Sequence, residues 1–265
     1  RFAQIPGRLV LYCARGGMRS QSIAHVLTGF GRDVHLIEGG YKAYREYVLR
    51  RMVDEIRCRT FIVLQGHTGV GKTHILQALA EQGYGVLDLE GLAHHAGSVF
   101  GHIAFLDKQP SQKQFENELF EALLQLPRVV LLERESRKIG KLYLPNVLLE
   151  AIKQAEHILL RTSLTRRVAT ILEDYHPEGQ ARKPELKEAI DHLKGRLPNN
   201  EITRLKDQID QGAFEPVIRY LMEHYYDPLY QKSVKSQEND YLLSITFDNR
   251  EEAIEQIKQL INPLS

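Results

Sequence analysis

The sequence predicts an α/β fold built on a parallel sheet, and two observations lead to that prediction. Short apolar runs of strand length alternate with longer amphipathic stretches along most of the 265 residues. A glycine-rich segment, GHTGVGKT, lies between one such run and one such stretch. Strands separated by helices form parallel βαβ units with helices on both faces of the sheet. The length allows one large domain or two smaller ones.

The runs that we interpret as strands are rich in Val, Ile, Leu and Phe and end at glycine or polar residues. In chain order they are residues 9–13, 34–40, 60–66, 85–91, 128–136, 156–163 and 241–247. Helices are expected where apolar residues recur every three or four positions. These helices begin near residues 19 and 71 or cover residues 41–56, 112–126, 146–155 and 251–261. Residues 164–235 lack strand signals and are expected to form several helices before the last strand.

Composition and charge are those of a soluble globular protein. The chain is 43% hydrophobic and 26% charged, with a net charge of +1 that indicates neither presence nor absence of a nucleic-acid partner. It has no apolar run long enough to span a membrane, and its first residues lack the apolar stretch of a signal peptide. We expect a cytoplasmic protein whose two cysteines, Cys13 and Cys58, are reduced. A start at Arg1 is consistent with a fragment or a processed product.

The most specific motif is GHTGVGKT, which matches G-x-x-x-x-G-K-[ST] between a predicted strand and a predicted helix. Its residues are Gly66, His67, Thr68, Gly69, Val70, Gly71, Lys72 and Thr73. In such a loop the backbone N–H groups surround a phosphate, the lysine neutralises further oxygens, and the hydroxyl can bind Mg²⁺. The segment predicts a phosphate site, with a chance glycine-rich turn as the alternative.

Nucleotide hydrolysis would also require an acidic residue at the end of a neighbouring strand. Four acids qualify by position, Asp88 and Glu90 after one predicted strand and Glu133 and Glu135 at the end of another. The sequence does not single out one of the four, and no base-reading element is evident. Binding of a diphosphate is therefore a firmer prediction than ATP hydrolysis.

A second anion-binding loop is predicted around the cysteine of CARGGMR. Its residues are Cys13, Arg15, Gly16, Gly17 and Arg19, between a strand and a helix. Inward-pointing N–H groups, nearby arginines and a helix N-terminus favour a thiolate over a thiol and stabilise a charged adduct on sulfur. The chemistry indicated is nucleophilic or chalcogen-carrying. An inert buried cysteine and a phosphatase-like loop remain alternatives.

These residues resemble a known family. LYCARGGMRSQSIA followed by LIEGGYKAYR resembles the C-terminal half of a rhodanese domain. With GHTGVGKT, DLEGLAHHAGSVFG, QPSQKQFEN, ERESRKIG and YYDPLY in that order, the chain is similar to the tRNA 2-selenouridine synthase family. It departs from the family in lacking the front half of the rhodanese domain. It also has Ala96 in the segment His95–Ser98, where the family commonly carries an arginine.

The resemblance implies that sulfur is replaced by selenium in the wobble 2-thiouridine of tRNA, through an S-geranyl intermediate. Geranyl diphosphate would occupy the phosphate loop, and selenophosphate would act at the Cys13 loop. The implied partners are tRNA with wobble 2-thiouridine, geranyl diphosphate and selenophosphate. No tightly bound cofactor is expected, although Mg²⁺ on Thr73 is expected to accompany a diphosphate. Two anion loops would then serve two donors that act on one base.

The domains expected from this resemblance are a rhodanese-like C-terminal half over residues 1–55 and a P-loop domain over residues 56–265. The P-loop domain includes the helical segment at about residues 164–235. The family segments also supply candidate site loops at the carboxyl ends of strands. Their residues are Asp88, Glu90, His94, Ser98, Glu135 and Arg137. A surface turn and a structural ion pair are the alternatives, and zinc is disfavoured because adjacent histidines point apart.

Two other functions stay open at this point. A P-loop kinase or NTPase fused to a sulfurtransferase remnant would turn over ATP without tRNA. A non-catalytic tRNA-binding module would bind tRNA in a salt-sensitive manner without modifying it. The basic and tyrosine residues of the helical segment suit an anticodon arm, but acids are interleaved with them, as in an ordinary solvated helical bundle.

Overall fold

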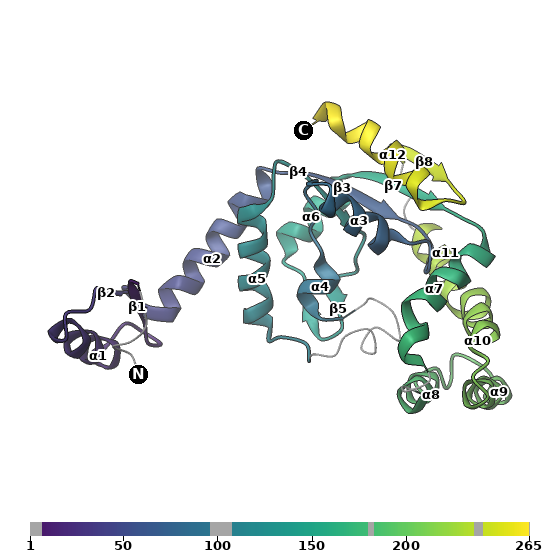
Figure 1. The fold of residues 1–265 in the computed structure, drawn as a ribbon, viewed down its shortest axis with the longest axis horizontal. Helices are drawn as coiled ribbons and strands as arrows, with labels where there is room; N and C mark the ends of the chain where they lie inside the picture. Colours follow the sequence, from purple (N-terminus) through teal and green to yellow (C-terminus); the bar gives the residue numbers. More distant parts are fainter. Residues whose placement is uncertain (1–6, 96–107, 180–182, 236–240, 265) are drawn as a thin grey trace. The chain divides into compact units, whose positions relative to one another are not determined.

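A computed structural model describes residues 7–95, 108–179, 183–235 and 241–264. The chain divides into two compact units, Arg1–Ile56 and Arg57–Ser265. Figure 1 traces both units along the sequence. Among the helices of the described ranges, none combines the length and the apolar character that a membrane span requires.

The first unit is a small α/β arrangement. Strand β1 (Leu9–Leu11) pairs in parallel with β2 (Val34–Leu36), and helix α1 (Met18–Gly29) connects them. Helix α2 (Gly40–Arg57) follows. Both strands are shorter than expected. After β1, the carbonyl groups of Cys13 and Ala14 accept hydrogen bonds from the start of α2 instead of from a strand. That this unit is part of a rhodanese-like domain stays a prediction.

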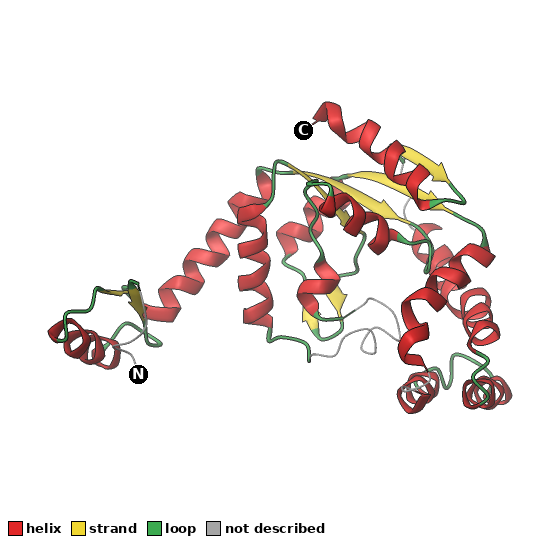
Figure 2. Cartoon of the chain, viewed as in Figure 1, coloured by secondary structure: helices red, strands yellow, loops and turns green. Residues whose placement is uncertain are grey.

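The second unit contains the predicted parallel sheet, which is confirmed. Its strands are β3 (Thr60–Gln65), β4 (Val129–Glu133), β7 (Glu156–Arg161) and β8 (Leu243–Thr246), in the spatial order β4-β3-β7-β8. Every pair is parallel. Figure 2 shows these strands as one twisted layer. All carboxyl ends of the strands therefore lie at one edge of the sheet, where sites are built in this class of fold.

Helices cover both faces of this sheet because strand residues point alternately to each side. Helices α3 (Lys72–Glu81) and α12 (Arg250–Ile261) pack with Ile62 and Leu64 in one buried cluster. Helix α6 (Asn146–Gln154) packs on β3, and Figure 1 places it on the other side from α12. Helix α5 (Gln112–Gln125) adds fully buried Phe115 and Leu119, and a 3₁₀ turn, η3 (Asn262–Leu264), follows α12.

The segment GVLDLEG differs from the predicted strand. Only Val86 forms a bridge, to Leu131 of β4, and helix α4 (Leu89–Ala93) begins three residues later. The reason is a helix cap, because the Asp88 carboxylate accepts a 2.8 Å hydrogen bond from the Gly91 N–H. A short hairpin, β5 (Lys138–Ile139) with β6 (Leu142–Tyr143), was not predicted and turns at Gly140 with a φ of 57°.

Residues 164–235 form helices in the part that the structure describes. They are α7 (Leu164–Gly179), α8 (Lys183–Asp191), α9 (Asn199–Asp210), α10 (Phe214–Leu221), a π-helical turn η2 (Met222–Tyr226) and α11 (Asp227–Lys235). Helices α8 to α10 bury a small apolar core of their own, which includes Ile190, Leu205 and Leu221. A π-helical turn often marks a functional position in a helix.

Candidate functional site

The phosphate loop connects β3 to α3, and glycines give it its shape. Gly69 and Gly71 have φ values of 78° and 91°, which a residue with a side chain rarely adopts. A side chain at Gly66 would lie 2.7 Å from the carbonyl oxygen of Leu160 on the neighbouring strand. The Val70 N–H donates a 3.1 Å hydrogen bond to the His67 carbonyl and closes the turn. The loop therefore requires glycine at three of its positions.

Lys72 and Thr73 begin α3 and face the end of the neighbouring strand β4. The Thr73 hydroxyl donates a 2.5 Å hydrogen bond to Oε1 of Glu133. The Lys72 ammonium lies 3.6 Å from Oε2 of the same carboxylate and 3.5 Å from the Gly66 carbonyl oxygen. Parallel pairing places Glu133 opposite Leu64, two residues before Gly66 at the start of the loop. Of the four acids that the sequence left open, Glu133 occupies the position beside the phosphate loop.

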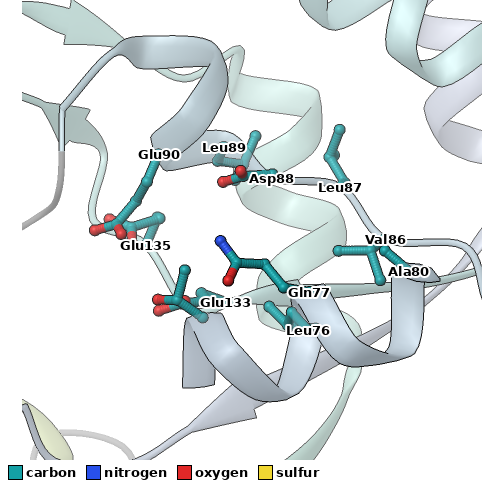
Figure 3. A pocket seen from close by; sticks show the side chains of 11 residues that line it. Leu76, Gln77, Ala80, Val86, Leu87, Asp88, Leu89, Glu90, Glu133 and Glu135 are labelled. Atoms are coloured by element: carbon teal, nitrogen blue, oxygen red, sulfur yellow. The ribbon is translucent and has the colours of Figure 1, made fainter. Parts of the chain in front are cut away.

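A cleft of about 860 Å³ opens over the loop. Its lining comes mainly from the loop, from residues 133–137, from α6 and from the helical segment, and Glu90 of α4 adds to it. Three of the lining side chains are the carboxylates of Glu90, Glu133 and Glu135, which Figure 3 shows close together. Burial raises the pKa of Glu135 to about 8, and the charges of Glu90 and Glu133 act in the same direction. Glu135 is therefore a carboxyl that changes charge close to neutral pH.

A smaller cavity of about 140 Å³ adjoins this cleft, since both are lined by Thr73, Glu90, Glu133 and Glu135. The rest of its wall is mostly apolar. These further lining residues are Leu76, Gln77, Ala80, Val86, Leu87, Asp88 and Leu89. In Figure 3 the Gln77 side chain points toward the carboxylates, which lie on one side of the cavity. The cavity thus combines one side that carries carboxylates with an apolar wall.

The other predicted site residues are placed differently from one another. Asp88 caps α4 and lines the small cavity, and Arg137 is exposed at the rim of the large cleft. His94 ends α4 with a φ of 47° and lines neither cavity. Ser98 lies outside the described residues. Within the described ranges, no cluster of three or more His, Cys, Asp or Glu residues could hold a metal ion.

Sequence reasoning missed a buried ion pair behind the phosphate loop. Arg167 of α7 donates hydrogen bonds of 2.9 and 2.6 Å to the two carboxylate oxygens of Asp227 and one of 2.8 Å to the Thr68 carbonyl. The Arg167 side chain is only 6% exposed. The signal available was the segment YYDPLY, which contains Asp227, although nothing in the sequence indicated its partner.

A second missed network lies beneath the cleft. Arg134 donates a 2.9 Å hydrogen bond to the Gln65 side-chain oxygen, so the Gln65 amide nitrogen is the atom 2.6 Å from Nδ1 of His157. That nitrogen donates, and His157 accepts at Nδ1. Burial lowers the pKa of His157, with the Arg134 charge as the next cause, so the ring is neutral. Gln65 and His157 are buried, and the network supports the floor of the cleft.

In the first unit, the cysteine loop surrounds a sulfur with hydrogen-bond donors. The Gly17 N–H lies 3.1 Å from Sγ of Cys13, and the Ser20 hydroxyl lies 3.3 Å from it. Hydrogen bonds lower the pKa of Cys13 to about 6. The bond from the Ser20 side chain is the largest cause, and bonds from the backbone of Arg15 and of Gly17 add to it. Cys13 is therefore a thiolate at neutral pH. Arg15 and Arg19 are exposed beside it.

Gly16 and Gly40 allow this loop to close against the start of α2. A side chain at Gly16 would lie 2.8 Å from the Gly39 nitrogen, and one at Gly40 would overlap the Cys13 carbonyl oxygen. The Tyr41 N–H donates a 2.9 Å hydrogen bond to that carbonyl. The close backbone approach explains the paired glycines of LIEGG, which carry no chemistry themselves.

The parallel sheet, the glycine loop after β3, and Lys72, Thr73 and Glu133 at its mouth define a P-loop phosphate-binding protein. Residues 59–261 match the family model described as the tRNA 2-selenouridine synthase AAA domain. The chain belongs to the tRNA 2-selenouridine synthase family.

Curated relatives agree with this assignment. The chain is 36% identical over 253 residues to the tRNA 2-selenouridine synthase of Shewanella halifaxensis, covering 84% of this chain and 68% of the relative. It is 35% identical over 263 residues to that of Alcanivorax borkumensis, covering 88% and 68%. The chain thus spans about two thirds of the length of these relatives. Among solved structures, it is similar to shikimate kinase from Acinetobacter baumannii with a TM-score of 0.36 and 17% identity, covering 80% of this chain and 98% of that one.

Proposed function

We propose that the protein is a transferase that replaces sulfur by selenium in the wobble 2-thiouridine of tRNA, through an S-geranyl intermediate. Family membership supports the tRNA substrate and the selenium product. The observation that carries the proposal is the arrangement of Lys72, Thr73 and Glu133 at a phosphate loop that adjoins a cavity with an apolar wall opposite its carboxylates. Such a site suits a diphosphate joined to a hydrocarbon.

In the first proposed step, the 2-thio sulfur attacks C1 of geranyl diphosphate, the C1–O bond breaks, and diphosphate leaves. The loop N–H groups and Lys72 stabilise the negative charge that develops on the leaving group. Alkylation of the sulfur releases the N3 proton of the base. Glu135 lines both cavities and its pKa of about 8 suits a proton acceptor near neutral pH.

The donor atoms present fit a magnesium ion beside the diphosphate. The Thr73 hydroxyl and the Glu133 carboxylate lie 2.5 Å apart and are both oxygen donors, which Mg²⁺ prefers. We propose that these two residues hold the ion, directly or through water. Once bound, Mg²⁺ would neutralise charge on the diphosphate. The Lys72 ammonium, 3.6 Å from the same carboxylate, supplies a further positive charge at this end of the loop.

In the second proposed step, the selenium of selenophosphate attacks C2 of the base, the C2–S bond breaks and the geranylthiol leaves after taking up a proton. Water then cleaves the P–Se bond and phosphate is released. The Cys13 loop supports this assignment, because it presents several hydrogen-bond donors to a charged chalcogen. We further propose a cytoplasmic location, in which a reactive thiolate stays reduced.

The experiment uses the natural protein that contains this chain, with 2-thiouridine tRNA, geranyl diphosphate, selenophosphate and Mg²⁺. Mass spectrometry of the wobble nucleoside is the readout for this protein and for Cys13→Ser and Lys72→Ala. We expect the protein to form 2-selenouridine, Cys13→Ser to stop at the S-geranyl nucleoside, and Lys72→Ala to leave 2-thiouridine unchanged. An unchanged nucleoside together with ATP consumption in a parallel reaction would instead support a P-loop kinase or NTPase.

A further inference from the structure

The helical segment packs against the phosphate loop and also lines part of the cleft above it. The edge of one aromatic ring meets the face of the other between His67 and Tyr230, with ring centroids 4.3 Å apart. Gly69 is so close to the segment that a side chain there would lie 2.7 Å from Met222, in the π-helical turn, and 2.8 Å from the Arg167 carbonyl oxygen. The loop is thus held from behind by residues from α7, the π-helical turn and α11.

Between these two contacts, Arg167 fixes the carbonyl of Thr68. Its Nε donates a 2.8 Å hydrogen bond to that oxygen, while its two terminal nitrogens donate to Asp227 at 2.9 and 2.6 Å. The guanidinium is planar, so the pair with Asp227 also sets the direction in which Nε points. Both side chains are largely buried, at 6% and 20% exposure. Arg167 therefore has one defined geometry at the loop.

The orientation of this carbonyl determines the orientation of a phosphate donor. In a planar trans peptide the C=O and the following N–H point in opposite directions. With the Thr68 carbonyl turned toward Arg167, the Gly69 N–H is directed away from Arg167, as a donor to an anion on the concave side of the loop requires. Gly69 is the residue at which this peptide could most easily rotate, because glycine tolerates both signs of φ. The hydrogen bond from Arg167 opposes that rotation.

We propose that Arg167 is a positioning residue for phosphate binding, which orients the Thr68–Gly69 peptide while Asp227 holds Arg167 in place. The inference rests on the proposed function only in that the loop binds a diphosphate. It is independent of the tRNA and of selenium. It also explains why Arg167, the residue of the helical segment that donates to the loop, is itself held by an ion pair between α7 and the first residue of α11.

The test measures the Kd of magnesium pyrophosphate by calorimetry for the protein and three variants. Arg167→Met is expected to weaken binding about tenfold or more, because a misoriented donor is lost from the site. The Kd of Arg167→Lys is expected to lie between those of the unchanged protein and of Arg167→Met, since lysine keeps the charge but not the three hydrogen bonds. Arg166→Met is the matched control, because Arg166 is its neighbour on α7 and pairs at 3.9 Å with Glu173. Its Kd is expected to stay within about twofold.

A double variant separates positioning from folding. Arg167→Met alone leaves the Asp227 carboxylate buried and unpaired, whereas Arg167→Met with Asp227→Leu removes both charges. We expect the double variant to unfold at nearly the same temperature as the unchanged protein. Its affinity for pyrophosphate is expected to stay as low as that of Arg167→Met. Recovery of both would overturn the inference, because the pair would then act only on stability.

The outcomes also distinguish this inference from the proposed function. If Lys72→Ala weakens pyrophosphate binding and Arg167→Met does not, the phosphate site stands and the role of Arg167 is overturned. If both variants weaken binding but the unchanged protein modifies no tRNA, the role of Arg167 is supported and the proposed reaction is overturned.

Discussion

The hydroxyl of Thr73 and the carboxylate of Glu133 are joined by a 2.5 Å hydrogen bond, although 60 residues separate them in the chain. Lys72 lies 3.6 Å from the same carboxylate. The parallel pairing of β3 with β4 produces this contact, because it brings the two strand ends to one edge of the sheet. Glu133 thus shares the mouth of the phosphate loop with the residues that would meet a diphosphate.

Replacement of this carboxylate should lower the rate of catalysis strongly while it changes the stability of the folded protein little. Glu133→Gln keeps the size of the side chain and its ability to accept from Thr73, but it removes the charge opposite Lys72. We expect the rate of nucleoside alkylation to fall about 100-fold and to lose its response to Mg²⁺. The measurement is the initial rate over a titration of Mg²⁺. An unchanged magnesium dependence would assign the metal ligand to another residue.

The Cys13 thiol should react as a thiolate well below neutral pH. With Cys58→Ser as the background, the rate of alkylation by iodoacetamide is expected to rise with a midpoint near pH 6. Ser20→Ala removes the largest cause of the lowered pKa, so its midpoint should move upward toward 9.0, the ordinary value. Identical midpoints in the two proteins would show that the Ser20 hydroxyl does not stabilise the thiolate.

Gly40 should tolerate no side chain, because a Cβ there overlaps the Cys13 carbonyl oxygen and the Gly16 nitrogen, and its φ is 63°. Gly40→Ala is expected to displace the Cys13 loop and shift the alkylation midpoint upward. Gly17→Ala is the control, since a Cβ at Gly17 meets no atom within 4 Å and its N–H to Cys13 is kept. Equal alkylation profiles for the two variants would contradict the proposed packing.

Glu135 should make the folded protein less stable as the pH rises. Its pKa is raised in the folded state from 4.5 to about 8, so its favourable contribution is complete below pH 4.5 and is lost as the pH rises through about 8. Glu135→Gln cannot ionise and avoids this loss. We expect it to unfold a few degrees higher than the unchanged protein at pH 9 and at a similar temperature at pH 4.5. Thermal unfolding of both proteins at the two pH values measures the difference.

Catalysis supplies a second readout for the same residue. If Glu135 accepts the N3 proton, alkylation by the unchanged protein should increase with pH up to about 8. Glu135→Gln should be slower and should lose this dependence. Glu90→Gln is an informative comparison, because the charge of Glu90 raises the pKa of Glu135. We expect Glu90→Gln to shift the pH profile of alkylation to lower pH while activity remains. A profile that does not move would indicate that another group titrates.

Local patterns predicted much of the fold. The alternation of apolar runs with amphipathic stretches located β3, β4, β7 and β8 and the helices between them, since side-chain periodicity follows backbone geometry. The prediction failed at GVLDLEG, where the capping carboxylate of Asp88 starts α4 and leaves a single bridge at Val86. A short apolar run does not distinguish a strand from a bridge followed by a helix.

The sequence by itself determined the two loops, because a phosphate loop and a cysteine loop depend on glycines and donors that are close together in the chain. Only the tertiary structure decided which acid meets Thr73 and which residue holds the loop from behind. Thr73–Glu133 and Arg167–Asp227 are each 60 residues apart. Such contacts depend on strand order and helix packing, and those arise from burial of the whole core, which no local pattern specifies.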